Sequence, residues 1–320
     1  MSQVINPAVP RAAKAPLGTR FARSFRKYWP YYVLLLPAIA YFIIFCYGPM
    51  YGVQIAFKDF KIKKGFGGSP WANPWNKYFL QFFDSYYAWK IIRNTLVLSL
   101  YSLIVGFPIP IILALSMDEM RHPRLKKIVQ TITYAPNFIA VVVMCGMILN
   151  FTSQTGGLIN NLIVKLGGEA IPFMYKENLF PHIYVWTGVW QGMGWSSVIY
   201  FAALSGLNPQ LLEAATLDGA SRVQKIWHVK LPTLLPTVII QLILSCGSIL
   251  NVGYEKVFLL QNDLNINTSE IISTYVYKRG MVDAQYSFST AVGLSQSIVS
   301  FVLVAIVNIV ARRVSETSLW

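Results

Sequence analysis

A set of long apolar runs constrains this sequence more than any other feature. A helix that crosses the hydrocarbon core of a bilayer needs about 20 mostly apolar residues, and six segments of this chain meet that length. They lie at about residues 31–57, 94–116, 128–150, 183–207, 233–252 and 288–311. None carries Lys, Arg, Asp or Glu in its middle, where an ionisable side chain is costly. The pattern predicts an all-α polytopic membrane protein with six transmembrane helices, in which residues 31–320 form the membrane domain.

The composition agrees with this prediction. Hydrophobic residues make up 55% of the 320 residues and charged residues only 12%, whereas a soluble domain carries about 25% charged residues. Disorder is excluded, because it requires low hydrophobicity and high charge. Cys46, Cys145 and Cys246 all lie within apolar runs. We expect small buried hydrophobic side chains there rather than disulfides or metal ligands.

The distribution of charge predicts an orientation. Lys and Arg outnumber Asp and Glu by 27 to 13, which in a soluble protein would suggest nucleic acid. In a membrane protein, basic residues collect on the cytoplasmic side. Residues 1–30 contain six bases and no acid, so we expect a basic cytoplasmic arm and no nucleic-acid partner. Six spans then return the C-terminus to the cytoplasm. The first apolar run is too long for a signal peptide and has no small-x-small cleavage site, so we interpret it as an uncleaved anchor.

No arrangement of residues points to catalysis. His122, His182 and His228 are far apart, and no metal-binding spacing, GxxxxGK[ST] or GxSxG motif occurs. The spans also lack the ionisable pairs expected of an intramembrane enzyme or an ion-driven pump. We predict that the chain is not an enzyme and has no catalytic residue or metal site of its own. Any energy for its activity must then come from another subunit.

The most specific stretch lies between the fourth and fifth apolar runs. It reads LSGLNPQLLEAATLDGASRVQKIWHVKLPTLLP, from 204 to 236. We expect two short helices joined at Gly219, because Asp-Gly permits a left-handed turn. Pro209 suits the start of the first helix, and Ser221 can cap the second. We expect Leu231-Pro232 to end the second helix before the fifth span.

This stretch resembles the EAA loop of binding-protein-dependent ABC importer permeases. The family pattern joins EAA, DGA and a terminal I-x-LP, with Ile226 here where an aromatic is common and Val229 where Ile is common. The resemblance implies a type I importer permease fold in which residues 208–232 couple the permease to a cytoplasmic ATPase. The coupling residues it implies are Glu213, Ala214, Ala215, Asp218, Gly219, Ala220, Leu231 and Pro232.

The resemblance also implies the partners of the chain. They are a second related permease, two ATPase subunits at the cytoplasmic face and an extracytoplasmic solute-binding protein, all at the bacterial cytoplasmic (inner) membrane. ATP and Mg²⁺ would be bound by the ATPases, and this chain would hold no cofactor. The alternative is a secondary transporter or channel for a polar solute without an ATPase partner. It would show internal repeats and intramembrane charges, and we see neither.

Further segments resemble the carbohydrate branch of the family. Asn94-Thr95 and the residues 157–160 match sugar-importer permeases, and residues 48–61 resemble the branch for oligo- and polysaccharides, including uronate-containing ones such as alginate. The implied function is ATP-driven import of an acidic, alginate-like oligo- or polysaccharide.

Polar residues at helical spacing suggest a path for such a substrate. Gln241, Ser245 and Ser248 share one face of the fifth span, and Asn251 continues it. The candidate path residues are Trp190, Gln191, Trp195, Gln241, Ser245, Ser248, Asn251 and Gln296. Small and hydroxyl residues also mediate helix packing in membranes, and tryptophans anchor at interfaces, so both alternatives stay open.

The loop at 57–93 has an excess of positive charge. It holds seven bases against Asp59 and Asp84. We hypothesise that it attracts an acidic saccharide or an acidic surface of the binding protein; a solvated loop with snorkelling lysines is the alternative. The candidate contact residues are Lys58, Lys61, Lys63 and Lys64.

Overall fold

A computed structural model describes the backbone of residues 17–314 and the side chains of residues 27–313. Most of the expected basic arm at 1–30 lies outside the residues whose side chains are described. Within the described backbone, the structure is helical apart from turns, loops and one isolated antiparallel bridge between Lys58 and Trp71. The chain divides into two compact units, Met1–Gln54 and Ile55–Trp320, which we describe separately.

The first unit is a run of helical segments that meets the length of a membrane span. It comprises α1 (Leu17–Tyr41), the π-type segment η1 (Phe42–Tyr47), α2 (Gly48–Met50) and the beginning of the 3₁₀ segment η2 (Tyr51–Phe57). The 31 residues Lys27–Phe57 are long and apolar enough to cross a bilayer, as the first apolar run predicts. Cys46 lies exposed in this run and not buried as expected, whereas Cys145 in the second unit is buried.

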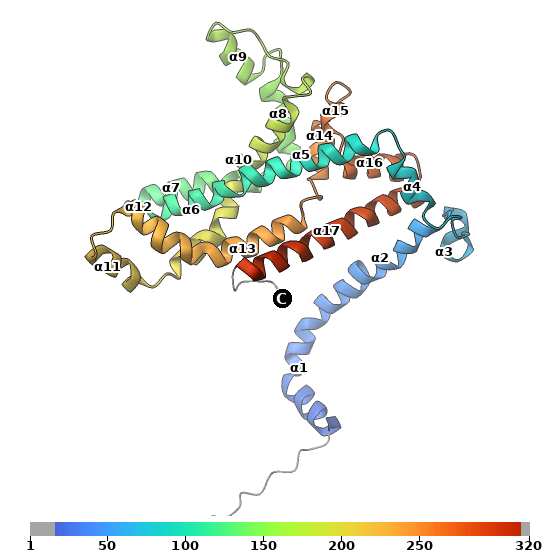
Figure 1. Cartoon of the computed structure of the whole chain (residues 1–320), viewed down its shortest axis with the longest axis horizontal. Coiled ribbons are helices and arrows are strands. Elements are labelled where there is room, and N and C mark those ends of the chain that lie inside the picture. Colours follow the sequence, from blue (N-terminus) through green and yellow to red (C-terminus); the bar gives the residue numbers. More distant parts are fainter. Residues whose placement is uncertain (1–16, 315–320) are drawn as a thin grey trace, which may run out of the picture. The chain divides into compact units, whose positions relative to one another are not determined.

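The second unit contains the remaining helices. In chain order they are η3 (Ile62–Lys64), α3 (Gly65–Gly68), α4 (Lys77–Phe83), α5 (Ala88–Gly106), α6 (Pro108–Asp118), α7 (Pro123–Tyr134), η4 (Ala135–Phe138), α8 (Val141–Thr152), α9 (Leu158–Lys165), η5 (Phe173–Tyr175), α10 (Phe180–Ser205), α11 (Pro209–Leu217), α12 (Arg222–Lys225), η6 (Ile226–Lys230), α13 (Leu231–Gly247), α14 (Tyr254–Leu260), α15 (Ile266–Ser269), α16 (Ile272–Tyr277), η7 (Lys278–Val282) and α17 (Tyr286–Val314). Within this unit, α11 and α12 lie at one end and α4 at the other (Figure 1).

The apolar helices agree with the expected spans in most places. By length and composition, three stretches of this unit could cross a membrane: Ala88–Asp118, Arg222–Gly247 and Tyr286–Arg313. The all-α membrane architecture is therefore confirmed. The fourth expected span is the single 26-residue helix α10, but by length and hydropathy it is not among the helices that qualify as spans. Its crossing of the membrane stays a prediction.

The third expected span is not a straight helix. Its two halves, α7 with η4 and then α8, meet at 101°. Pro136 lies in η4, where its missing N–H and fixed φ disfavour a continuous α-helix. Ile139 and Ala140 then adopt extended conformations before α8 begins. Together α7, η4 and α8 form a broken span or a re-entrant segment.

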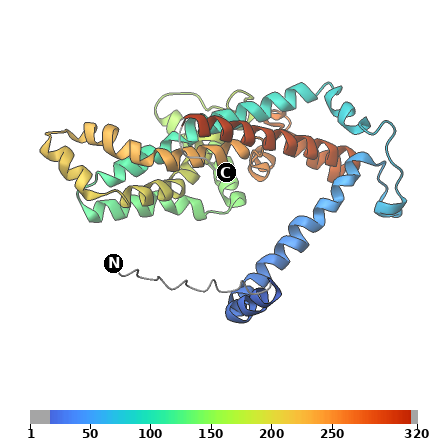
Figure 2. The ribbon, with the colours of Figure 1, turned by 60° about the horizontal axis from the view of Figure 1, so that its bottom comes forward.

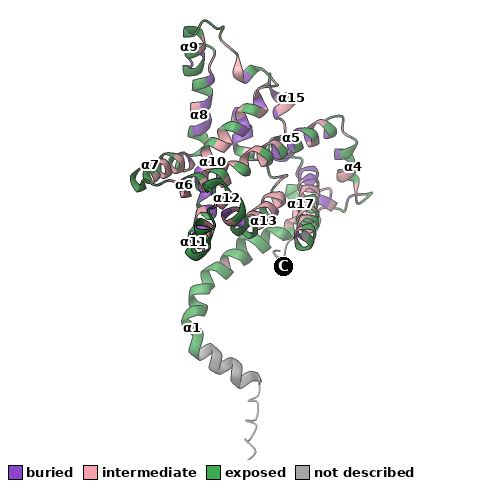
Figure 3. Ribbon diagram, turned by 60° about the vertical axis from the view of Figure 1, so that its left-hand side comes forward, coloured by how far each residue is buried: buried purple, intermediate pink, exposed green. Residues whose placement is uncertain are grey.

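The helix α10 is central to the packing of the second unit. It contacts α5, α6, α7 and α13, and α13 in turn packs along α17 (Figure 2). Where α10 crosses α7, a Cβ on Gly194 would stand 2.0 Å from the backbone oxygen of Thr133. Only glycine permits this approach. Among the described helices, α5, α10 and α17 carry the most buried residues, and Figure 3 colours buried positions purple.

The fifth span is shorter than its apolar run. α13 ends at Gly247, and residues 248–253 leave the helix before α14 begins at Tyr254. Ser248 and Asn251 therefore do not lie on a continuous face of α13, which corrects the expected helical stripe.

Candidate functional site

The loop between α10 and α13 folds as two short helices joined at a glycine, as predicted. The Asn208 carboxamide oxygen caps α11 by accepting from the backbone N–H of Gln210 at 3.0 Å. Gly219 has φ of +77°, in the left-handed region that glycine adopts without strain. Ser221 then caps α12 in a capping box with Gln224, at 3.3 and 2.7 Å.

The second helix of this loop does not end at Leu231-Pro232, contrary to expectation. It widens into the π-type turn η6 and continues as α13, with the backbone N–H of Leu231 bonded to the oxygen of Ile226. Pro232 is the second residue of α13, which follows η6 directly. The loop is therefore continuous with the fifth span.

The loop presents polar and apolar side chains to solvent. Glu213 and Ala214 are exposed, and four large apolar side chains are more than half exposed: Leu211, Leu217, Val223 and Trp227. A groove of about 240 Å³ lies inside the bend, lined by Ala215, Asp218, Gly219, Ala220, Gln224, Lys225, His228 and Val229. Several large apolar side chains exposed on one short loop, beside a small groove, are typical of a protein-binding surface.

A larger cavity of about 550 Å³ lies among α5, α6, α10, α13 and residues 248–253. Its polar and aromatic lining consists of Ser99, Ser102, Phe107, Tyr184, Trp195, Ser196, Tyr200, Gln241, Ser245, Ser248 and Asn251. None of the residues that line it is Lys, Arg, Asp, Glu or His. The cavity therefore offers neutral hydrogen-bonding groups and aromatic faces, within the size range of small-molecule sites.

Five of the eight candidate path residues meet in this cavity: Trp195, Gln241, Ser245, Ser248 and Asn251. The other three lie outside its lining. Gln191 donates to the backbone oxygen of Ile139 at 3.1 Å. Gln296 donates to the oxygen of Leu250 at 2.7 Å and to Asn251 Oδ1 at 3.0 Å. Trp190 is 44% exposed.

The sequence analysis missed the contribution of α5 and of the tyrosines on α10. Ser99 and Ser102 are three residues apart on α5 and line the cavity with Tyr184 and Tyr200. Hydroxyls at i and i+3 in an otherwise apolar run were an available signal, because such residues share a helix face.

A buried lysine that the sequence analysis did not single out lies behind the cavity wall. Lys256, on α14 outside the expected spans, is 8% exposed. Its ammonium donates to the backbone oxygen of Tyr184 at 2.9 Å and lies 4.9 Å from the centre of that tyrosine ring. Burial lowers the pKa of Lys256 to about 8.

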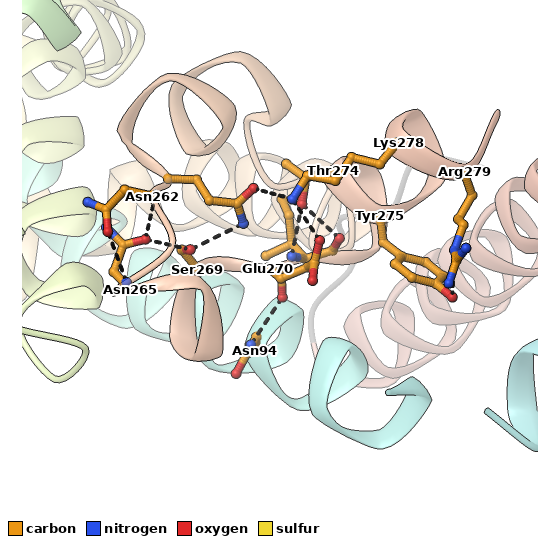
Figure 4. Close-up of polar contacts among 11 residues, drawn as sticks. Asn94, Asn262, Asn265, Ser269, Glu270, Thr274, Tyr275, Lys278 and Arg279 are labelled. Atoms are coloured by element: carbon orange, nitrogen blue, oxygen red, sulfur yellow. Dashed lines mark hydrogen bonds and ion pairs between the residues drawn. The ribbon is translucent and has the colours of Figure 1, made fainter. Parts of the chain in front are cut away.

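The Asn94-Thr95 pair connects α5 to the segment between α13 and α17. Asn94 donates to the backbone oxygens of Asn267 and Glu270 at 2.8 and 3.1 Å, and Thr95 accepts from the N–H of Ile272. Nearby, Lys278 bonds Gln261 at 2.7 Å and Glu270 at 2.9 Å (Figure 4). The bonds of Asn94 and Thr95 hold residues 267–272 against α5, whereas those of Lys278 stabilise residues 261–278 internally.

The basic loop at 57–93 separates its lysines into two groups. Lys58 is buried; it donates to the oxygen of Phe66 at 2.6 Å and lies over the Trp71 ring. Lys58 is therefore not available as the expected contact for a saccharide or the binding protein, because its ammonium is buried and hydrogen-bonded within the loop. Lys61, Lys63 and Lys64 are exposed on and beside η3.

A carboxylate on the same loop has partners of its own. Asp59 accepts from Lys77 at 2.8 Å and from Tyr78 at 2.5 Å, and these hydrogen bonds lower its pKa.

Comparison with known proteins identifies the family. The model for the binding-protein-dependent transport system inner membrane component matches residues 106–316. The chain belongs to this family. The expected permease subunit of an ABC importer is thereby confirmed, over the alternative of a self-sufficient secondary transporter.

The relatives of this importer subunit include two proteins of Bacillus subtilis (strain 168). The polygalacturonan/rhamnogalacturonan transport system permease protein YteP is 40% identical over 289 residues, which cover 90% of this chain and 89% of YteP. Protein LplB is 39% identical, with 90% of each chain covered.

A solved structure confirms the type I permease fold. A chain of a bacterial alginate ABC transporter, in complex with its alginate pentasaccharide-bound periplasmic protein, superposes with a TM-score of 0.85 at 37% identity. The match covers 94% of this chain and 100% of that one.

Proposed function

We propose that this permease moves an acidic oligosaccharide through the 550 Å³ cavity, driven by ATPase subunits that bind the loop 208–232. The observation that carries the proposal is the cavity lining, in which hydroxyl, carboxamide and aromatic groups face a shared space without a charged side chain. Sugars present hydroxyls and apolar ring faces, so neutral donors, acceptors and aromatic rings suit them.

The acidic class of substrate is supported by the relatives and by the loop at 57–93. The names of YteP and of the alginate transporter refer to acidic polysaccharides. Lys61, Lys63 and Lys64 are exposed, and the described residues place no carboxylate within ion-pair distance of them. The carboxylates of the sugar would then interact with the lysines of this loop and not with the neutral cavity.

The assembly follows from the family. A second related permease completes the pathway, two ATPase subunits bind ATP and Mg²⁺, and a solute-binding protein delivers the sugar on the other side. The exposed apolar side chains of the loop would lie against the ATPase; they are Leu211, Leu217, Val223 and Trp227. Both chain termini would then face the cytoplasm, which protease accessibility in sealed vesicles tests.

The coupling role is tested in proteoliposomes that contain the complete importer. We expect Glu213→Ala and Gly219→Pro to abolish the ATP hydrolysis that loaded binding protein stimulates, with uptake lost in parallel. Gly219→Pro cannot adopt the positive φ at this position. Glu169→Ala changes an exposed acid outside the loop and serves as the control. Unchanged stimulation in both loop variants would reject the coupling assignment.

The path is tested with Gln241→Leu and Ser245→Val, and with Leu244→Ala as the control on the same helix. Leu244 is 51% exposed and does not line the cavity. We expect uptake of a galacturonate trimer to fall at least tenfold only in the first two. Equal uptake in all three variants would remove the cavity from the path.

The loop electrostatics are tested by reversing the charge of Lys61, Lys63 and Lys64, with Lys165→Glu as a control of equal sign. We expect uptake to fall several-fold at low salt and the difference to shrink as ionic strength rises. If the difference in uptake does not depend on salt, these lysines do not attract the sugar and are only a solvated surface.

A further inference from the structure

Two carboxylates stand at an unfavourable position at the end of α6. Asp118 is the last residue of α6 and Glu119 follows it as the cap. A negative side chain at a helix C-terminus is repelled by the partial negative charge of the helix end. The last turn of α6 contains no basic residue to offset this. The two acids therefore need a cation from another part of the chain.

Lys230 supplies that cation from the coupling loop. Its Nζ lies 2.6 Å from Asp118 Oδ2 and is also bonded to Glu119 Oε1. The Lys230 side chain is only 7% exposed, and the carboxylates are 24% and 27% exposed. The three groups form a compact ion-pair cluster between elements that are over 100 residues apart in sequence.

Lys230 is placed where the loop becomes a span. It is the last residue of η6, and the helical stretch Arg222–Gly247 runs through it without a break. A movement of α12 would reach α13 directly along this stretch. The ion pairs give the same movement a second route, into α6.

Both routes lead to the cavity. Beside the cluster, Ala114, Tyr200, Leu204 and Leu234 form a buried core that joins α6, α10 and α13. From Asp118 back to the lining residue Pro110 is about 12 Å along α6, at 1.5 Å per residue. From Lys230 forward to the lining residue Gln241 is about 16 Å along α13.

We propose that Lys230 is a positioning residue of the transport cycle, whose ion pairs with Asp118 and Glu119 transmit movement of the coupling loop to the α5–α6 wall of the cavity. The inference rests on the proposed docking of residues 208–232 on an ATPase. Without the ion pairs, the loop would still bind and respond to the ATPase, but α6 would follow it only through the apolar core and therefore to a smaller extent.

The test places reporters on each side of Lys230 in the complete importer. In a variant without the three native cysteines, an environment-sensitive fluorophore is attached at Gln210→Cys on α11 or at Ser102→Cys on the α5 wall. Gln210 is exposed and Ser102 lines the cavity. The signal change between nucleotide-free and ATP–vanadate states is compared in the parent and in Lys230→Met. This readout does not depend on which sugar is carried.

We expect Lys230→Met to keep the loop signal within twofold of the parent and to lower the cavity signal at least fivefold. Lys230→Arg, which retains the charge, should restore the cavity signal. If Lys230→Met fails to assemble, the triple variant Asp118→Asn, Glu119→Gln, Lys230→Met removes the ion pairs without leaving an unpaired charge, and the same loss is expected.

Two outcomes separate the inference from the proposed function. A cavity signal that stays at the parent level without the ion pairs overturns the role of Lys230. A loop signal that does not respond to ATP in the parent itself overturns the docking of residues 208–232, and the role of Lys230 with it.

Discussion

Lys230 precedes α13 in the chain and Lys256 follows it. Both side chains are almost fully buried, yet they have different partners. Lys230 has two carboxylates at the end of α6. Lys256 has the carbonyl and the ring of Tyr184, and the described residues place no carboxylate within ion-pair distance of it. The charge of Lys230 is balanced where it lies, whereas that of Lys256 is not.

The difference separates two uses of a buried charge. A buried ion pair costs desolvation on both sides and recovers it only while both partners are present. Lys230 is therefore sensitive to any movement between the loop and α6. A carbonyl and an aromatic ring compensate only part of the desolvation penalty of a buried ammonium. The positive charge of Lys256 therefore lies directly behind Tyr184, which lines the neutral cavity, and it lowers the stability of the fold.

Removing the partners of Lys230 should have the largest effect. Asp118→Asn with Glu119→Gln leaves a buried ammonium without a counter-charge. Because the two carboxylates are about a quarter exposed, water offsets part of the loss, and we expect destabilisation by about 2–3 kcal/mol. The measurement is thermal unfolding of the purified importer in detergent.

Adding Lys230→Met to the double variant should restore most of that stability. Asp283→Asn, which breaks the exposed Arg279–Asp283 pair, should change it by less than about 0.5 kcal/mol. A double variant as stable as the parent would mean that Lys230 is hydrated, and the contrast with Lys256 would disappear.

Removing the charge of Lys256 should have the opposite sign to removing the partners of Lys230. Lys256→Met replaces an unbalanced buried charge by an apolar chain of similar length, and we expect stabilisation by about 1 kcal/mol. The Tyr184 oxygen is not orphaned by this change, because Tyr184 lies inside α10, where a backbone oxygen accepts from the N–H four residues further on. Destabilisation by Lys256→Met would show that the carbonyl and the ring balance the charge as well as carboxylates do.

The contrast between these lysines could not be predicted from the sequence, although much around them could. The turn at Gly219, the cap at Ser221 and the all-α membrane architecture depend on local patterns, and the structure confirms them. Lys230 meets Asp118 across 112 positions, and Lys256 meets Tyr184 across 72. Such pairings depend on which helix faces pack together, which local spacing does not determine.

The errors at the ends of the spans have a similar origin. Leu231-Pro232 was expected to end a helix, but the π-type turn η6 lets the chain continue. Ser248 and Asn251 reach the cavity although the helical stripe that suggested them ends at Gly247. Apolar runs indicate which residues enter the membrane, whereas backbone packing decides where each helix breaks.

The pH dependence of stability should test the buried charge of Lys256. The pKa of Lys256 is lowered to about 8 in the folded chain, against about 10.4 in an unfolded one. The folded state therefore disfavours the charged form, and this penalty is complete below pH 8. It is relieved as the pH rises from about 8 towards 10, because the folded protein then releases the proton first.

The stability advantage of Lys256→Met over the parent should therefore shrink between pH 7 and pH 9.5, as measured by parallel melting curves. Groups that titrate in both chains contribute equally to both stabilities, so they cancel in the difference between the variant and the parent. A constant advantage over this range would show that Lys256 keeps its proton, and that its environment is more polar than its burial indicates.

The smallest expected effect concerns the position of the Lys256 ammonium itself. A Cβ on Gly188 would stand 3.3 Å from Lys256 Nζ, so Gly188→Ala should press on the end of a flexible side chain. Alanine also favours the α10 helix by up to about 1 kcal/mol over glycine, which obscures the contact in a single variant. In a double-mutant cycle the helix term cancels, and we expect Gly188→Ala to be about 0.5 kcal/mol more favourable in the Lys256→Met background. A coupling of zero would show that the ammonium does not lie against α10 at Gly188.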